Sequence, residues 1–382
     1  MAQITYNSTG TTVSIGPGAR LGDVAWQLDT YHGRALAHGL CPYVGVGGHT
    51  AFGGWGLASR NWGLLIDQLL SAVLVLADGS VVHVSARQSP DLFWAIRGAA
   101  SSFGIVTQYT FQTHQAPATV VRYEFFFENP TLSSAKFAEL SRSYQTWGLT
   151  APKEVGIVAN VIEGGKVVRI GGYYMGPLAD FKPIAASLFH VTGLPNSTYL
   201  EERAWLVALA EVGEGPLQTI GIPDGHDTFF SKSLVVPTSS PLTTAAFSAL
   251  AEHFANTPIP GITSWFIQFE LWGGGDSLIT SIPSTATAYP HRAHLWTIQF
   301  YVRSKRAWTA QDTAFITGMV SAMTDSMPDA LFAAYANYLD PELTGWQNKY
   351  YAGNYPKLAA LQKKFDPKGV FLKDQNIGAP NL

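Results

Sequence analysis

The segment from Cys41 to Gly56, CPYVGVGGHTAFGGWG, is the most glycine-rich part of the chain. Glycine leaves the backbone N–H groups bare, so a ligand can approach the main chain closely. The segment has neither a helical nor a strand period, and it matches neither the dinucleotide-binding GxGxxG pattern nor a Walker loop. We therefore predict a loop that cradles a ligand, but neither a nicotinamide dinucleotide nor a nucleoside triphosphate. The alternative is a structural turn between packed strands.

Cys41 is the only cysteine, which excludes an internal disulfide framework and a cysteine-rich zinc site. No metal site is predicted. Judged by residue type alone, a single cysteine is more often an inert buried residue than a reactive one. Its place at the entrance of the glycine-rich loop, directly before Pro42, favours the reactive interpretation, because reactive thiols lie at accessible sites.

Polar side chains on two aromatic strands, residues 264–274 and 294–303, form a second candidate group. Phe266, Gln268 and Glu270 occupy every second position of the first strand, so they share one face of it. Gln299 lies on the neighbouring strand. Amide and carboxylate groups among aromatic rings suit a sugar, which needs hydrogen-bond partners and an apolar contact. A solvated sheet face of mixed polarity is the alternative.

Tyr338 is the candidate base, within the segment YANYLD of residues 335–340. A free phenol has a pKa of ~10, so a tyrosine base at neutral pH needs a hydrogen-bond network or a nearby positive charge that favours its phenolate. Without further information, a core tyrosine on a strand is the simpler interpretation.

The elements that must position these groups fall into an N-terminal and a later part, with a boundary near Pro117. Up to residue 118, short strands alternate with glycine turns, including hairpins around Ser8-Thr9-Gly10 and around Asp78-Gly79. From residue 119, long alternating strands are separated by helical stretches. The predicted fold class is α+β, with an antiparallel sheet covered by helices on one side. The helices are expected at 21–28, 91–98, 131–145, 243–256, 310–325 and 356–367.

Composition limits the function classes. The 382 residues are 47% hydrophobic and 13% charged, with a net charge of −3, which excludes bulk disorder and argues against nucleic-acid and membrane-surface binding. No apolar run reaches the ~18 residues of a membrane span. The first residues lack the features of a signal peptide. Two glycosylation sequons, at Asn7 and Asn196, hint at secretion, and no pattern indicates an oligomeric state.

Several segments together resemble the berberine-bridge-enzyme-like FAD-linked oxidoreductases of the p-cresol methylhydroxylase/vanillyl-alcohol oxidase superfamily, and within them the fungal glucooligosaccharide-type oxidases. The similarity runs from about residue 10 to 378. The segments that carry it are 16–23, 38–49, 76–79, 91–99, 102–107, 350–355, 365–367 and 371–375. The resemblance implies the second subdomain of a two-subdomain FAD-binding domain at 1–118, with the first subdomain missing, a substrate-binding domain at 119–340, and a C-terminal segment at 341–382 that packs on the flavin domain.

The resemblance also implies FAD as cofactor, attached covalently through a thioether to Cys41. Val44 matches a gate residue beside the oxygen-reactive carbon of the flavin, where valine is typical of oxidases. The implied cradle for the flavin and pyrophosphate consists of Gly45, Gly47, Gly48, His49, Gly53 and Gly54. Ser102, Gly104, Ile105 and Val106 match the adenosine and pyrophosphate side. Tyr351 and Asn354 match the closing motif.

The implied reaction is the oxidation of an alcohol or sugar hydroxyl, with oxygen as final acceptor. Tyr338 matches the tyrosine of an Asn-Tyr-x-Asp strand, which removes the hydroxyl proton while hydride leaves for flavin N5. Glu270 stands where carbohydrate-oxidising relatives have an aspartate near this base. Phe266, Gln268 and Gln299 match substrate-binding positions. The implied partners are oxygen and a small molecule, either a sugar or a secondary metabolite.

The sequence departs from the family at its beginning. Family members are secreted and carry, before the point that corresponds to Met1, a leader and an Arg-Ser-Gly-Gly-His-type loop. The histidine of that loop is a second attachment point for the flavin, and the motif is absent here. We expect this to expose a sheet edge and part of the flavin pocket. Two functions stay open: an FAD-linked oxidase, or a truncated, non-catalytic remnant that at most binds a ligand.

Overall fold

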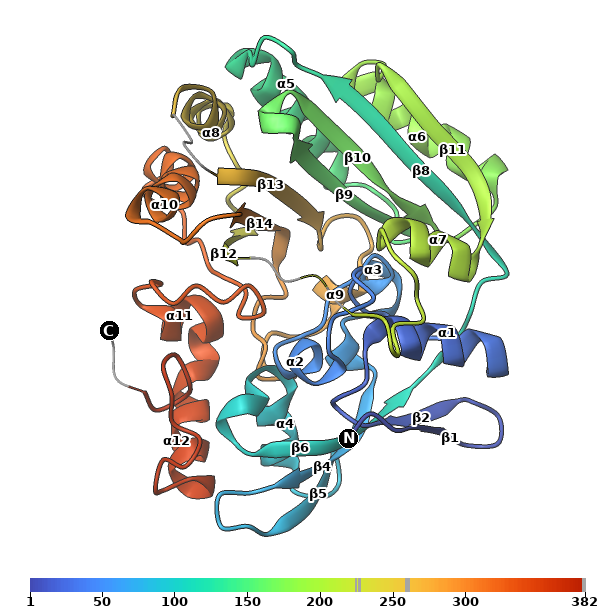
Figure 1. Ribbon diagram of the computed structural model, residues 1–382, viewed down its shortest axis with the longest axis vertical. Helices are drawn as coiled ribbons and strands as arrows, with labels where there is room; N and C mark the ends of the chain where they lie inside the picture. The colour runs from blue at the N-terminus through green and yellow to red at the C-terminus, as the bar shows by residue number, and fades with distance from the viewer. Residues whose placement is uncertain (224, 226–227, 258–261, 380–382) are drawn as a thin grey trace.

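The computed structural model describes residues 1–223, 225, 228–257 and 262–379. Two antiparallel sheets, one of five and one of seven strands, organise the described chain (Figure 1). The helices and strands alternate along the sequence in an α+β arrangement, which confirms the predicted fold class. A separate antiparallel pair is formed by β3 (Arg34–Ala35) and β7 (His114–Gln115), which belong to the same N-terminal part of the chain as the five-stranded sheet.

The five-stranded sheet is built from the N-terminal part, in the order β1-β2-β6-β4-β5. Its two predicted hairpins are present, and they turn at Gly10 and Gly79, whose φ angles of 66° and 84° favour glycine. Its strands are β1 (Ile4–Tyr6), β2 (Thr12–Ile15), β4 (Leu69–Val75), β5 (Val81–Ser85) and β6 (Ile105–Gln112). The predicted helices of this part are α1 (Leu21–His32) and α4 (Pro90–Ala99).

The seven-stranded sheet has the order β11-β8-β10-β9-β13-β14-β12, and every pairing in it is antiparallel. The two aromatic strands predicted from the sequence, β13 and β14, are neighbours in it. Its strands are β8 (Thr119–Glu128), β9 (Val155–Ile162), β10 (Val167–Tyr174), β11 (Ser197–Ala204), β12 (Thr228–Pro237), β13 (Ile262–Leu271) and β14 (His294–Ser304).

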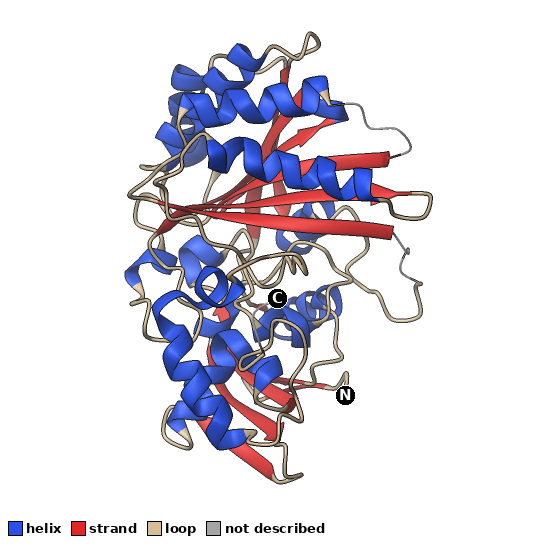
Figure 2. Cartoon of the chain, turned by 90° about the vertical axis from the view of Figure 1, so that its left-hand side faces the viewer, coloured by secondary structure: helices blue, strands red, loops and turns tan. Residues whose placement is uncertain are grey.

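Helices cover one face of this sheet, as expected (Figure 2). Phe137, Phe181, Phe247 and Met319 come from four different helices and share one apolar core with the strands. Alternate strand residues such as Ile267 and Ile298 supply the sheet side of this core. The four helices are α5 (Ser134–Gly148), α6 (Leu178–Thr192), α8 (Thr244–Asn256) and α10 (Ala310–Asp325).

The opposite face of the sheet packs against the N-terminal part. Trp55, Val158, Trp272 and Tyr335 belong to one buried cluster that joins the two parts of the chain. The shorter elements on this side are α2 (Val46–Ala51), α3 (Ser59–Trp62), α7 (Trp205–Val212) and α9 (Leu278–Ser281). The glycine-rich segment and the polar face of the sheet therefore meet across a buried contact.

The C-terminal helices return to the N-terminal part. The apolar core around the five-stranded sheet includes Trp346, Tyr350 and Leu358 from α11 (Trp346–Tyr351) and α12 (Tyr355–Phe365). Figure 1 shows α11 and α12 beside α4.

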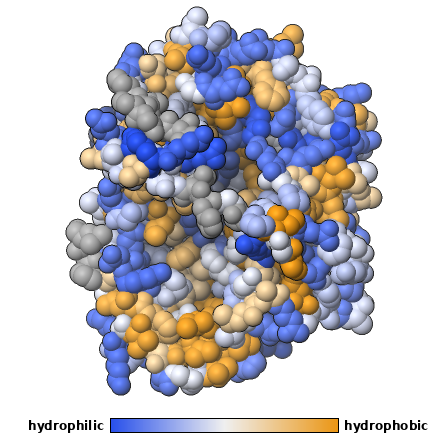
Figure 3. All heavy atoms as spheres, in the orientation of Figure 1, coloured by the Kyte–Doolittle hydropathy of each residue, from blue (hydrophilic) through white to orange (hydrophobic). Residues whose placement is uncertain are grey.

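A hydrophobic patch lies on the surface of the N-terminal part. Figure 3 shows hydrophobic side chains gathered at the lower end of the face seen in Figure 1, over α4 and β4–β6. Leu70, Val81 and Ile105 are exposed on those strands.

Two local expectations were wrong. The glycine-rich segment contains the six-residue helix α2, which begins after Gly45 and is too short to give a readable period. Residues 335–340 form a turn rather than a strand, with the Tyr338 N–H bonded to the Tyr335 carbonyl. Just before this turn, Ala333 forms an isolated antiparallel β-bridge with Val235 on β12, the edge strand of the seven-stranded sheet.

Candidate functional site

A buried carboxylate and a phenol form the centre of the candidate site. Glu270, near the end of β13, is fully buried, and its Oε1 accepts a hydrogen bond from the Tyr338 hydroxyl. The Gln268 amide donates to the same oxygen at 2.9 Å, and the Trp272 indole N–H donates to Oε2 at 2.9 Å. Glu270 therefore does not lie on a solvated sheet face, and both its oxygens are held in place.

The electrostatics of this pair differ from what a tyrosine base was expected to need. Burial raises the pKa of Glu270 to about 7, against the opposing effect of its three hydrogen bonds. Burial, followed by the neighbouring carboxylate, raises the pKa of Tyr338 well above its usual value. The neighbour that faces the phenol is an anion rather than a cation. Tyr338 is thus a neutral phenol beside a group that accepts a proton near neutral pH.

The turn that carries Tyr338 is tied to the glycine-rich segment. The Gly54 N–H donates to the Tyr335 hydroxyl at 3.0 Å. The Asn337 amide donates to the same hydroxyl at 2.8 Å and to the His49 carbonyl at 3.1 Å. These bonds place the predicted cradle and the predicted base next to one another, although they are far apart in the sequence.

The predicted cradle, the glycine-rich segment, has open space beside Gly45 and Gly48 that a flat group could occupy. A Cβ atom on Gly45 or Gly48 would meet nothing within 4 Å, whereas one on Gly56 would lie 1.6 Å from the His38 carbonyl oxygen. Cys41 has a free, exposed thiol, and Val44 is 37% exposed. Bare backbone beside an accessible thiol fits a planar cofactor such as FAD, which these residues would hold along one side.

The His49 side chain braces the cradle. Its Nε2 accepts a hydrogen bond from the Gly39 N–H at 2.9 Å, so the other ring nitrogen carries the proton. Burial, with a smaller contribution from the neighbouring His38, lowers the pKa of His49 to about 3. His49 is therefore neutral and fixes the loop that enters the glycine-rich segment.

The remaining predicted cofactor residues lie apart from the Tyr338–Glu270 pair. The Ser102 hydroxyl accepts from the Ile377 N–H at 3.0 Å, while Asn354 donates to the carbonyls of Ser284 and Thr287. Tyr351 is buried in the core of the N-terminal part. Gly104 and Val106 are buried at the start of β6, and the side chain of Ile105 is exposed.

A row of polar side chains crosses the sheet beside Glu270. Gln268 on β13 pairs in register with Gln299 on β14 and with Asn160 on β9, and Ser233 on β12 faces Gln299. Asn160 is only 7% exposed, so it belongs to the buried part of this row. Asn160 was missed because it stands alone in an apolar strand sequence.

Stacked aromatic rings continue this face. Phe266 and Tyr301 are register partners whose ring centroids lie 4.9 Å apart, and Phe229 stacks on the other side of Tyr301 at 5.0 Å. The predicted substrate residues Phe266, Gln268 and Gln299 thus lie together on the face that carries Glu270. Trp272 was also missed, although extending the two-residue period beyond Glu270 points to it.

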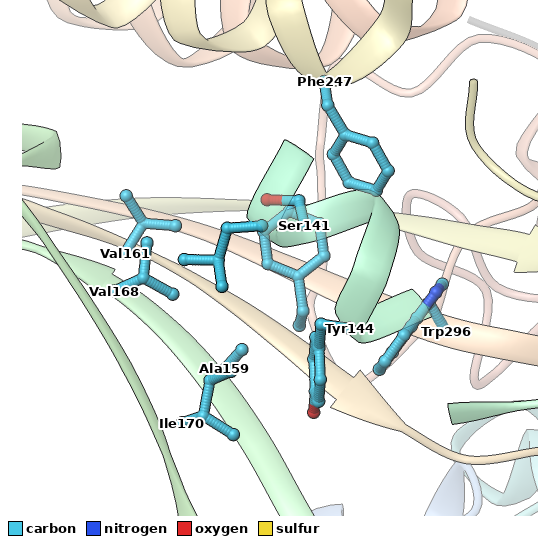
Figure 4. A pocket seen from close by; sticks show the side chains of 10 residues that line it. Ser141, Tyr144, Ala159, Val161, Val168, Ile170, Phe247 and Trp296 are labelled. Atoms are coloured by element: carbon cyan, nitrogen blue, oxygen red, sulfur yellow. The ribbon is translucent and has the colours of Figure 1, made fainter. Parts of the chain in front are cut away.

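A closed cavity lies on the other face of the sheet (Figure 4). It is enclosed by α5, α8 and strands of the sheet, with mostly apolar walls including Ala159, Val161, Phe247 and Trp296. Among its polar lining groups, the Tyr144 hydroxyl has no hydrogen-bond partner in the described structure. Since the sheet separates the cavity from Glu270, it belongs to the core rather than to the candidate site.

The described residues contain no group of three His, Cys, Asp or Glu side chains that could hold a metal ion. Among the described helices, none combines the length and the apolar character that crossing a membrane requires.

Family models match two segments of this chain. Residues 1–85 match the family described as FAD binding domain, and residues 334–378 match the family described as Berberine and berberine like. A carbohydrate oxidase of Microdochium nivale is 34% identical over 98% of this chain and 76% of its own length.

Solved structures show the same likeness. A xylooligosaccharide oxidase from Myceliophthora thermophila in complex with xylobiose has a TM-score of 0.91 and 31% identity, with 100% of this chain and 81% of that chain covered. A glucooligosaccharide oxidase from Acremonium strictum, whose FAD is described as 6-S-cysteinyl and 8α-N1-histidyl, has a TM-score of 0.90 and 31% identity, over 99% of this chain and 80% of that chain.

The FAD-binding match at the start, the α+β architecture and the C-terminal match define the class as FAD-linked oxidoreductases. The chain belongs to the berberine-bridge-enzyme-like family within that class, and it is homologous to fungal carbohydrate and oligosaccharide oxidases over nearly its whole length. The resemblance inferred from the sequence motifs is confirmed.

Proposed function

We propose that this chain is an FAD-dependent oxidase that removes hydride from a sugar carbon bearing a hydroxyl group, with oxygen as the final acceptor. The observation that carries the proposal is the hydrogen bond from Tyr338 to the buried Glu270, beside a glycine-rich segment with open space along its backbone. FAD, when bound, supplies the acceptor for the hydride. The protein supplies binding, orientation and the path of the proton.

In this proposal, Cys41 forms the thioether to the flavin, and Val44 lines the space beside the ring that oxygen enters. The backbone at Gly45, Gly47, Gly48, His49, Gly53 and Gly54 lies along the cofactor. Ser102, Gly104, Ile105, Val106, Tyr351 and Asn354 form the adenosine side. Ser102 and Asn354 act there through the segments they hold, since their polar atoms bond to Ile377 and to the 284–288 loop.

The residues of 1–118 and 341–382 form the cofactor side of the proposed enzyme, and those of 119–340 the substrate side. This division follows the two large sheets, with strands up to Gln112 in one and strands from Thr119 in the other. The C-terminal helices share the core of the first part. The pair Tyr338–Glu270 lies where the two sides meet, because Asn337 bonds to the His49 carbonyl.

The proton of the substrate hydroxyl moves in two linked steps. The Tyr338 oxygen accepts it while the phenol proton passes to Oε1 of Glu270, along the existing hydrogen bond. A free phenolate is never needed, which suits a phenol whose pKa is raised by burial and by the carboxylate. Since the pKa of Glu270 is about 7, the carboxylate form that accepts the proton dominates above neutral pH.

The proposed substrate is an oligosaccharide that lies along the polar row and the stacked rings. The Gln268 N–H₂ group donates to Glu270, which leaves its carbonyl oxygen to accept from a sugar hydroxyl. Asn160 and Gln299, the register partners of Gln268, extend the hydrogen-bonding row, and Phe266 offers an apolar contact beyond it. A similar structure was solved with xylobiose, which supports a sugar as substrate class.

The test has two parts. The purified 382-residue protein is precipitated with acid, and the pellet is examined for flavin absorption in the wild type and in Cys41→Ala. Hydrogen peroxide production is then measured with xylo-, cello- and chitooligosaccharides. The proposal expects yellow pellets for the wild type alone, and peroxide release with at least one sugar. A colourless wild-type protein without activity would instead support the non-catalytic alternative.

A further inference from the structure

The indole of Trp272 lies directly behind the proton-accepting carboxylate. Its N–H donates to Oε2 of Glu270 at 2.9 Å, on the side away from Tyr338. We propose that Trp272 is a positioning residue that orients Glu270 and favours its charged form, so that Oε1 is ready to take the proton of Tyr338. The catalytic part of this inference rests on the proposed function, whereas the effect on Glu270 does not.

Trp272 is fixed by the rings around it. It is fully buried, it stacks on Trp55 with centroids 5.7 Å apart and an interplanar angle of 8°, and it meets Tyr335 edge to face at 5.1 Å. The rings of His294 and Tyr289 lie 4.9 and 5.9 Å away. Since packing blocks other ring orientations, the indole N–H is aimed at Glu270 before any substrate arrives.

The backbone around Trp272 is held as firmly as its ring. The Trp272 N–H donates to the Leu295 carbonyl at 2.9 Å, and its own carbonyl accepts from the Ser277 hydroxyl at 2.7 Å. The next two carbonyls, of Gly273 and Gly274, accept from the buried Arg60 guanidinium at 3.2 and 3.1 Å. Arg60 lies on α3, next to the glycine-rich segment, so the cofactor side of the molecule fixes this donor.

The Arg60 guanidinium also donates to the backbone carbonyls of Ala151, Pro152 and Val155, in addition to those of the two glycines. Burial lowers its pKa to about 10, so it stays charged at neutral pH. It therefore clamps the end of β13 to the start of β9. These bonds hold the indole N–H of Trp272 in place relative to Glu270 on β13.

The charge of Glu270 depends on few groups. The titratable side chains that face it are Tyr338 and Tyr335 from the 335–340 turn and Tyr289 from the loop before β14, with His294 behind Trp272. Burial, as the first cause, lowers the pKa of His294 well below its usual value, so this ring is neutral. The three hydrogen bonds from Tyr338, Gln268 and Trp272 are thus the main stabilisation of the carboxylate.

The experiment is an infrared titration of the Glu270 carboxyl group, identified as the protonated C=O band that is missing in Glu270→Gln. In Trp272→Phe, we expect its midpoint to rise by about one pH unit, because a carboxylate that loses one donor binds its proton more tightly. Trp55→Phe is the matched control. It removes another buried indole from the same ring cluster, but the N–H of that indole makes no hydrogen bond in the described structure.

A second variant keeps the shape of the side chain. Benzothienylalanine at position 272 replaces the indole N–H by sulfur and leaves the ring packing intact, so it decides the question if Trp272→Phe does not fold. An upward shift in this isostere with an unchanged midpoint in Trp55→Phe supports the inference. The inference is overturned if the midpoint is unchanged in the isostere. It is also overturned if Trp272→Phe and Trp55→Phe shift the midpoint equally. The titration needs neither flavin nor substrate, so failure of the proposed oxidase activity is a separate result.

Discussion

The hydroxyl of Tyr338 donates a hydrogen bond to Oε1 of Glu270, a residue 68 positions earlier in the sequence. The phenol lies on a turn between the sheet edge and the C-terminal helices, and the carboxylate lies on a central strand. Neither group is suited to act alone, since burial and mutual repulsion oppose ionisation of the phenol. Together they form a path for one proton from the substrate to a buried acceptor.

Tyr338→Phe removes the only hydroxyl that links substrate and Glu270 in this account. We expect kcat with an oligosaccharide to fall by roughly 10²–10⁴-fold, the usual contribution of a positioned acid–base group. Flavin content should stay at the wild-type value, because the cradle is a different part of the chain. Tyr355→Phe on α12 is the control, as its ring packs on Trp346 away from the pair. Equal kcat values in the two variants would remove Tyr338 from the reaction.

Val44→Leu tests the space beside the proposed flavin. Val44 is 37% exposed, so the added methylene enlarges an open position without disturbing the core. We expect slower reoxidation by oxygen at an unchanged rate of flavin reduction by the sugar, because only the small oxidant must reach that side of the ring. Stopped-flow measurement of the two half-reactions separates these rates. An equal slowing of both would show that Val44 does not act as a gate.

Glu270 also makes the stability of the protein depend on pH. Its pKa is raised from 4.5 to about 7 on folding, so the folded state binds the proton more tightly than the unfolded state. This contribution to the free energy of unfolding is fully present below pH 4.5 and is lost as the pH rises through 7. The loss is on the order of 3 kcal/mol, since one pKa unit corresponds to about 1.4 kcal/mol.

Glu270→Gln removes this pH dependence. Urea unfolding at pH 5 and pH 8 should therefore show the variant gaining stability relative to the wild type at the higher pH. Glu252→Gln, at an exposed position on α8, is the control and should follow the wild type. If the difference between Glu270→Gln and the wild type is the same at both pH values, the folded-state pKa of Glu270 is not raised.

Much of the fold and part of the site follow from local sequence patterns. The two-residue period placed Phe266, Gln268 and Glu270 on one face, and the register of β13 with β14 brings Gln299 beside Gln268. Hairpins around Gly10 and Gly79 were also readable, because turns that need positive φ angles select glycine. These features depend on neighbours in the sequence or on the alternation of a single strand.

The rest depends on contacts between distant segments. No period in the sequence shows that Tyr338 meets Glu270, that Gln268 faces Asn160, or that Arg60 clamps the residues after Trp272. The turn at 335–340 was expected to be a strand because its sequence resembles the Asn-Tyr-x-Asp strand of the family. Its hydrogen bonds to Gly54 and His49, through Tyr335 and Asn337, replace the ladder of a strand.

The role of Glu270 as proton acceptor is tested by the pH dependence of kcat in the wild type and in Glu270→Gln. We predict that kcat of the wild type rises with pH through an acid limb near pH 7, where Glu270 becomes the carboxylate that accepts the proton. In Glu270→Gln the residual rate should be lower and should lack this limb. An acid limb that persists unchanged in Glu270→Gln would contradict the account, because another group would then be the acceptor.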